Sequence, residues 1–333
     1  MTRITMRTFL FGVLAFSCSG TGEHSGEKDR PVTQVAKENV IPRVQVEEPA
    51  PPASLPEDMT KNLVSGKIVG ARPISMRSLS LKIRLAQGDV AVFKPMRRDN
   101  RTARFEVAYF RLAKLLGVER VPPSIMRKIP LSRLMGHLDK HFPDVASSLG
   151  KEALTGNNGA VPGAMIAWMN DIVESGLDGR KGRVKLDLLL SIDGPTSGEE
   201  PLVAPASSMV VLDYVTGNWD RFSGGNLFAD SSGSSLVLID NNGSFSNWSK
   251  RQRERMDDLL SSCQRFSVAL ISRLRELEER AVTDAVEWGP TGPGRALLRK
   301  SEIALLLARR DALIAHVDEL IATHGEARIL VFP

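Results

Sequence analysis

Two carboxylates and an amide stand close together in the second half of the chain. Asp220 and Asn226 both lie in the segment GNWDRFSGGNLF, and Asp240 closes the apolar run LVLID. One carboxylate can orient or deprotonate a hydroxyl group, while a second carboxylate and an amide oxygen can hold a divalent cation. Together these groups suit a site for a metal-bound nucleotide. Either segment alone is more typical of a capped turn after an apolar element.

Lys94 closes the last of three short runs in which apolar and polar residues alternate. The runs cover residues 63–71, 79–86 and 90–95, and loop or turn residues separate them. Period-two alternation interrupted by turns predicts a three-stranded antiparallel meander. We therefore expect Lys94 at the end of the third strand.

Glu106 lies in the first turn of a predicted helix. In residues 103–118 the apolar side chains recur with a period near 3.6 residues, and Gly117 supplies a stop signal. A lysine on a third strand and a glutamate on the next helix can fix the lysine against the phosphates of a nucleotide. The same two residues could equally form an ordinary surface ion pair.

The two aspartates follow segments that can carry them to one place. Residues 207–219 are mostly apolar and predict a buried helix that delivers Asp220 to its C-terminal loop. Residues 235–241 predict a strand that ends near Asp240. The order of a strand lysine, a helix glutamate, a loop aspartate and a strand aspartate is much less probable by chance than either half alone.

These segments resemble the atypical kinases of the secretory pathway, the group that contains Four-jointed and the Golgi casein kinase. The resemblance covers roughly residues 63–280 and rests on VFKPM, FEVAYFRLAKLLGVERVPPS, LDYVTGNWDRFSGGNLF and LIDNNGSF, which occur in the family's order. It implies an α+β, two-lobed protein-kinase-like fold. The N-lobe would be a small antiparallel sheet and the C-lobe mainly helical.

The resemblance also implies roles for five residues. Lys94 would pair with Glu106 and contact the phosphates of ATP, Asp220 would be the catalytic base, and Asp240 and Asn226 would hold Mn²⁺ or Mg²⁺. Asn226 departs from the family pattern, because it follows Asp220 by six residues where relatives have five. The segment between the two contains a glycine pair that could absorb the extra residue.

The implied function is metal-dependent transfer of a nucleotide γ-phosphate to a hydroxyl on an exported protein or glycan. One alternative is a catalytically inactive pseudokinase that acts as a binding or scaffold module. Another is a cytoplasmic kinase of the toxin type, whose N-terminal segment is not an export signal. Residues 1–18 bear on the choice between an exported and a cytoplasmic protein, because they look like a bacterial export signal.

The N-terminus resembles an export signal. In residues 1–18 two arginines precede the apolar FLFGVLAF and then SCSG, which predicts a bacterial lipoprotein lipidated at Cys18. Ordinary cleaved secretion and a fortuitous apolar leader are the alternatives. Residues 19–58 are rich in Pro, Glu, Gly and Ser and predict a disordered linker, so that residues 59–333 form the kinase-like domain.

Composition limits the partners. The chain carries 44 basic and 39 acidic residues, a net charge of +5, and only 5% aromatic residues, which does not indicate a nucleic-acid surface. No apolar run reaches the roughly 18 to 20 residues that span a bilayer. We expect membrane attachment by a lipid anchor only.

Three glycosylation sequons bear on the compartment. They begin at Asn100, Asn242 and Asn247, and a glycan on Asn242 would block the proposed metal loop. Export to a bacterial periplasm or cell surface therefore fits better than a glycosylating secretory pathway. A periplasm or cell surface is not expected to supply ATP. Either the donor is scavenged or different, or the N-terminal segment does not export, or the fold persists without kinase activity.

Other segments are expected to be architectural. Residues 155–163 and 191–208 are rich in glycine and small residues and predict surface loops. Residues 163–172, GAMIAWMNDI, are expected to connect the lobes and touch adenine. Residues 251–282 and 301–325 show helical periodicity and are expected to pack under the C-terminal lobe.

Overall fold

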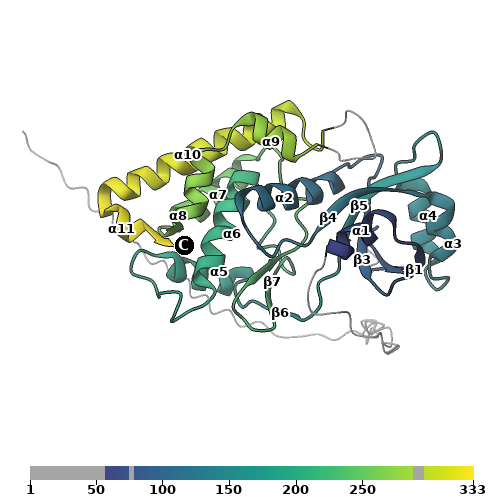
Figure 1. Cartoon of the computed structure of the whole chain (residues 1–333), viewed down its shortest axis with the longest axis horizontal. Helices are drawn as coiled ribbons and strands as arrows, with labels where there is room; N and C mark the ends of the chain where they lie inside the picture. Colours follow the sequence, from purple (N-terminus) through teal and green to yellow (C-terminus); the bar gives the residue numbers. More distant parts are fainter. Residues whose placement is uncertain (1–56, 75–78, 288–295) are drawn as a thin grey trace, which may run out of the picture. The chain divides into compact units, whose positions relative to one another are not determined.

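An antiparallel sheet of five strands forms the N-terminal part of the structure (Figure 1). The computed structural model describes residues 57–74, 79–287 and 296–333. The predicted leader, Cys18 and the predicted linker up to residue 56 lie outside the described residues. The strands of the sheet are β1 (Ile68–Pro73), β2 (Leu81–Leu85), β3 (Val90–Pro95), β4 (Ser124–Pro130) and β5 (Ala160–Ala167), in the spatial order β1-β2-β3-β5-β4.

The alternation of β3 decides which way Lys94 points. Ala91 and Phe93 are fully buried on one face of the sheet, whereas Val92 and Lys94 point to the other face. Val92 packs against the large core that also holds the helices. Lys94 therefore enters the space between the sheet and the helical part of the chain.

The predicted meander is correct for β1 to β3, but the sheet has two more strands. The prediction of a loop over residues 155–163 is wrong for its last four residues, which belong to β5. Gly163 is a glycine because strands approach closely there: an added Cβ would lie 2.5 Å from the Lys94 carbonyl oxygen. The predicted first strand also begins too early, because Leu63 lies in α1.

The remaining elements are mostly helical. The helices are α1 (Glu57–Ser65), α2 (Ala103–Leu116), α3 (Leu131–His137), α4 (Pro143–Glu152), α5 (Gly179–Leu190), α6 (Val203–Thr216), α7 (Lys250–Ser261), α8 (Val268–Arg275), α9 (Glu279–Ala285), α10 (Lys300–His324) and α11 (Glu326–Ile329). The other strands are β6 (Ile172–Glu174), β7 (Leu227–Asp230), β8 (Leu236–Leu238), β9 (Phe266–Ser267) and β10 (Leu330–Phe332). Strands β6, β7 and β8 form a small antiparallel sheet, and β9 pairs in parallel with β10.

Helix α2 ends at the predicted stop, whereas α6 ends at Thr216, three residues before the predicted helix over residues 207–219. Gly117 and Gly217 follow their last turns with φ values of 70° and 75°, the left-handed conformation that favours glycine. Helix α6 begins at Val203, so the predicted loop over residues 191–208 is wrong for its last six residues. The predicted helical stretch at 251–282 corresponds to α7, α8 and α9, with β9 between α7 and α8. The predicted stretch at 301–325 corresponds to α10.

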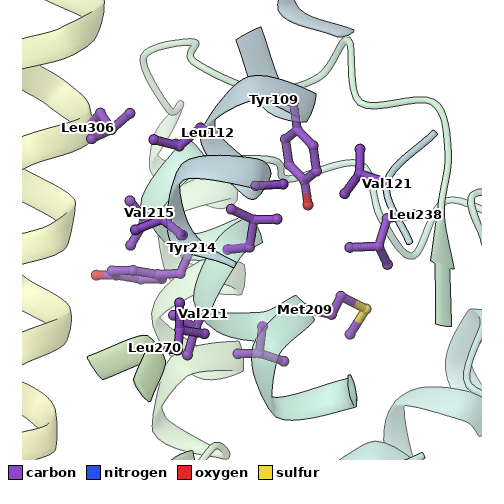
Figure 2. Close-up of a cluster of buried hydrophobic side chains, with 14 of the residues drawn as sticks. Tyr109, Leu112, Val121, Met209, Val211, Tyr214, Val215, Leu238, Leu270 and Leu306 are labelled. Atoms are coloured by element: carbon purple, nitrogen blue, oxygen red, sulfur yellow. The ribbon is translucent and has the colours of Figure 1, made fainter. Parts of the chain in front are cut away.

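Two hydrophobic cores define two lobes. The smaller core lies between one face of the five-stranded sheet and α1, α3 and α4. The larger core joins the other face of the sheet to α2, α6, α8 and α10. Figure 2 shows side chains that converge in this second core from α2, α6, β8, α8 and α10: Tyr109, Leu112, Met209, Val211, Tyr214, Val215, Leu238, Leu270 and Leu306.

Helix α6 is the centre of the larger core. It is apolar nearly all round, which is typical of a helix buried on every side. Helices α5, α7 and α10 pack against it. In the part of the chain that the structure describes, no helix combines the length and apolar character needed to cross a bilayer.

Candidate active site

Lys94 and Glu106 form an ion pair between the sheet and α2. Lys94 Nζ lies 2.6 Å from Glu106 Oε1, and the Glu106 side chain is only 2% exposed. The second oxygen, Glu106 Oε2, accepts a hydrogen bond of 3.0 Å from the backbone N–H of Asn241. Glu106 thus ties the lysine on β3 to the loop that follows β8.

Asp240 is brought to the same lysine. Its Oδ1 lies 2.7 Å from Lys94 Nζ, and its side chain is 44% exposed, so the carboxylate faces open space. Asp240 has a φ of 54°, an uncommon conformation for a residue other than glycine and one that often marks a functional position. Burial lowers the pKa of Lys94, but the charges of Glu106 and Asp240 outweigh this effect and raise it overall.

Asp220 follows α6 and faces the same region. Its backbone N–H donates to Asn218 Oδ1 at 3.4 Å, and Gly243 packs against it so closely that an added Cβ would lie 2.9 Å from Asp220 Cβ. Partial burial raises the pKa of the Asp220 carboxyl, a hydrogen bond from Ser223 opposes that shift, and the negative charge of Asp240 adds to it. A carboxyl with a raised pKa is better suited to accept a proton.

Asn226 follows the glycine pair and contacts the loop that carries Asp220. Gly224 and Gly225 have φ values of 104° and 80°, which other residues rarely adopt. Asn226 Nδ2 donates to the Asp220 carbonyl oxygen at 3.1 Å and to Ser223 Oγ at 3.2 Å. These bonds leave the amide oxygen Oδ1, the atom a metal requires, as the remaining acceptor.

A buried arginine that the sequence analysis missed supports both aspartate loops. Arg221 has a fully buried side chain, and its Nε lies 2.9 Å from Asp213 Oδ2. Its Nη1 donates to the carbonyl oxygens of Asn226 and Ile239, each at 2.8 Å, and its Nη2 donates to Asn241 Oδ1 at 2.6 Å. One guanidinium therefore fixes the backbone beside Asn226 and beside Asp240.

Asp213 is the counter-charge of Arg221 inside α6. It also accepts hydrogen bonds from the Tyr109 hydroxyl at 2.6 Å and from Asn218 Nδ2 at 3.1 Å. Burial, followed by the charge of Asp213, raises the pKa of Tyr109 well above its usual value, so the phenol stays a donor. A lone carboxylate in the apolar run MVVLDYV was the signal that could have revealed this network, because a buried charge requires a partner.

A second arginine, Arg309 on α10, holds the end of α6 before Asp220 and the segment after Asp240. Its Nη1 donates to the Thr216 carbonyl oxygen at 3.3 Å and its Nη2 to the Ser246 carbonyl oxygen at 2.6 Å. The guanidinium lies 3.9 Å from the centre of the Trp248 ring. Burial lowers the pKa of Arg309 to about 10, so it remains charged near neutral pH.

The donor set fits a cation that is shared with a ligand. Asp240 and Asn226 offer one carboxylate and one amide oxygen, and no group of three or more His, Cys, Asp and Glu with metal-binding geometry occurs within the described residues. Mg²⁺ is commonly held by one or two carboxylates together with substrate phosphates. The residues present therefore suit a metal that arrives with a nucleotide.

The segment predicted to connect the lobes is half strand and half connection. Residues 163–167 belong to β5, and the chain then leaves the sheet at Trp168 and enters β6 at Ile172. The Trp168 ring lies under Lys82 Nζ, 4.0 Å from the ring centre. The predicted contact with adenine stays a prediction.

The structure resembles solved structures of two kinds. It matches hydra Fam20 with sugar at a TM-score of 0.64 and 18% identity over 81% of this chain and 90% of that chain. It matches the Golgi casein kinase with Mn/ADP bound at a TM-score of 0.62 and 15% identity over 82% of this chain and 78% of that chain. No protein family model and no curated protein sequence matches the chain.

These similarities establish the fold. The chain has an α+β, two-lobed protein-kinase-like fold, with a small antiparallel sheet in the N-lobe and a mainly helical C-lobe. The structure also brings Lys94, Glu106 and Asp240 into direct contact, with the charge of Asp240 acting on Asp220. The individual roles of these residues stay predictions.

Proposed function

We propose that the chain is a metal-dependent phosphotransferase that moves the γ-phosphate of ATP to a hydroxyl on a protein or glycan. The observation that carries this proposal is Lys94, which bridges Glu106 on α2 and Asp240 after β8 with contacts of 2.6 and 2.7 Å. Residues from both lobes meet at one ammonium group. A phosphate-binding lysine requires such an arrangement, whereas an ordinary surface ion pair does not.

We infer a role for each residue, which its contacts support. Lys94, held by Glu106, would bind the nucleotide phosphates, and Asp240 and Asn226 would hold Mn²⁺ or Mg²⁺. The metal, when bound, would neutralise charge on the phosphates. Asp220 would orient the acceptor hydroxyl and take its proton as the hydroxyl oxygen bonds to phosphorus and the bond from phosphorus to the leaving ADP oxygen breaks.

The structural relatives support the donor and the class of acceptor. One of them has Mn and ADP bound and is called a casein kinase, and another has a sugar bound. These ligands support a nucleotide, a metal and either a protein or a glycan acceptor for this chain. The glycine pair supports activity over the pseudokinase alternative, because it lets Asn226 keep its amide oxygen available.

Ligand binding by the purified chain tests this proposal. ATP with Mn²⁺ should raise the melting temperature, since a ligand at a hundred times its dissociation constant stabilises the folded state by about 2.7 kcal/mol. Asp240→Asn should lose the metal-dependent part of the rise. Asparagine tolerates the φ of 54° found at this position, so the fold should persist. Measuring the shift with ATP and EDTA provides the control.

ATP turnover completes the test. The wild-type chain should consume ATP in the presence of Mn²⁺ or Mg²⁺. The proposed function would be contradicted if ATP with either metal left the melting temperature unchanged and the chain consumed no ATP. Binding without any turnover would instead identify a pseudokinase.

We also propose that the protein is exported and anchored by lipid at Cys18, on the basis of the sequence of residues 1–18 alone. Metabolic labelling with a palmitate analogue should tag the wild type but not Cys18→Ala, and the mature chain should begin at Cys18. Recovery of an unprocessed chain that still carries Met1 in the cytosol would overturn the export proposal.

A further inference from the structure

Asp178 joins two segments that lie far apart in the sequence. It is the N-cap of α5, where its Oδ1 accepts a hydrogen bond of 2.7 Å from the Gly179 backbone N–H. Its other oxygen, Oδ2, accepts a second hydrogen bond of 2.7 Å from the backbone N–H of Gly225. One carboxylate thus caps a helix and holds the glycine pair of the loop that carries Asn226.

The glycine pair has little else to hold it. Gly224 and Gly225 are exposed, and a Cβ added to either would find no heavy atom within 4 Å, so packing does not fix their backbone. Glycine loses more conformational freedom on ordering than any other residue. Among the described residues, the bond from Gly225 to Asp178 is the only hydrogen bond of either glycine.

The two residues that follow the glycine pair are each held by a side chain. The Asn226 carbonyl oxygen accepts from Arg221, and the Leu227 carbonyl oxygen accepts from Ser175 Oγ at 3.0 Å. The pairing of β6 with β7 continues from there. Asp178 supplies a contact on the other side of Asn226, in the segment that the family resemblance indicates to be one residue longer than usual.

We propose that Asp178 is a positioning residue, which holds the glycine pair so that the amide oxygen of Asn226 can act as a metal ligand despite the extra residue. This inference rests on the proposed function. Asp178 acts through the backbone of Gly225 and does not itself touch the metal or the nucleotide. Loss of its contact should therefore lower the affinity for the cation first and leave the binding of ATP phosphates by Lys94 in place.

A serine at position 178 separates the two functions of Asp178, the capping of α5 and the contact with Gly225. Asp178→Ser keeps a good N-cap for α5, but its side chain is too short to serve Gly179 and Gly225 together. The concentration of Mn²⁺ that gives half-maximal activity should rise about 10-fold or more, since residues that orient metal ligands typically contribute 10- to 100-fold in metal affinity. The kcat at saturating Mn²⁺ should largely recover.

Ser249→Ala is the matched control. Ser249 is the exposed N-cap of α7, it accepts from Gln252 N–H, and it makes no contact with the glycine pair. This variant should leave the Mn²⁺ requirement unchanged. Hydrogen exchange adds a readout that does not depend on turnover: the Gly225 amide should lose protection in Asp178→Ser and keep it in Ser249→Ala.

The outcomes separate this proposal from the proposed function. A wild type that needs Mn²⁺, with the same Mn²⁺ requirement and Gly225 protection in Asp178→Ser, overturns the role of Asp178 alone. An equal loss of kcat at every Mn²⁺ concentration also overturns it, because that result indicates a purely structural cap. A wild type that neither binds Mn²⁺ with ATP nor turns over contradicts the proposed function itself.

Discussion

Asp220→Asn should lower kcat by roughly 10² to 10⁴, the usual contribution of a positioned general base. The amide cannot accept the proton of the acceptor hydroxyl, but it has nearly the same shape. The contacts of the backbone around Asp220 with Asn218, Ser223 and Asn226 should persist. Affinity for ATP with Mn²⁺ should therefore stay close to that of the wild type, as measured by calorimetry alongside single-turnover kinetics.

Asp193→Asn is a suitable control for this experiment. Asp193 has an 83% exposed side chain and pairs with Arg328 at the surface, so its substitution should change neither kcat nor nucleotide affinity. A full rate in Asp220→Asn would remove Asp220 from the chemistry. Loss of nucleotide binding in the same variant would assign it to binding instead of proton transfer.

Asp213→Asn should cause the largest loss of stability among the single substitutions considered. It leaves the Arg221 guanidinium, which is 0% exposed, without its counter-charge. Removing one partner of a buried ion pair typically costs about 3 to 5 kcal/mol of unfolding free energy. The change should appear in urea unfolding as a lower midpoint with an unchanged slope.

A partly exposed ion pair provides the comparison. Arg183 and Asp187 lie four residues apart on α5, at 2.8 Å, and the Asp187 side chain is 42% exposed. Asp187→Asn should cost no more than about 1 kcal/mol, the range for surface pairs. If Asp213→Asn were as mild, Arg221 would have found another counter-charge, and the network would not be what holds the two loops.

The elements that bear the site were predictable because their signals are local. The period of residues 103–118 and Gly117 define α2, and the alternation of residues 90–95 defines β3. Each pattern also decides the direction of its polar residue, since Glu106 and Lys94 interrupt a face that is otherwise apolar. The expectation that the two residues pair came from the kinase-like order of a strand lysine and a helix glutamate, and the family resemblance implied it.

The features that were missed depend on contacts between distant residues. Gly163 carries the same local signal whether it marks a loop or a strand that approaches another strand closely, and only the backbone of β3 distinguishes the two. Arg221 and Arg309 look like ordinary surface charges in the sequence. Their importance comes from carbonyl oxygens up to 93 residues away, which no periodic pattern encodes.

Helix α10 sets a fixed spacing between the two halves of the site. Near its start Glu302 makes a bidentate ion pair with Arg104, two residues before Glu106, and Arg309 holds the loops that carry Asp220 and Asp240. Seven residues of α-helix correspond to about 10 Å and almost two full turns, so the side chains of Glu302 and Arg309 project from the same face of α10. The helix therefore fixes both the distance between the two contacts and the direction in which each side chain points. One inserted residue between them would turn Arg309 by about 100° relative to Glu302, and the two anchors could no longer engage together.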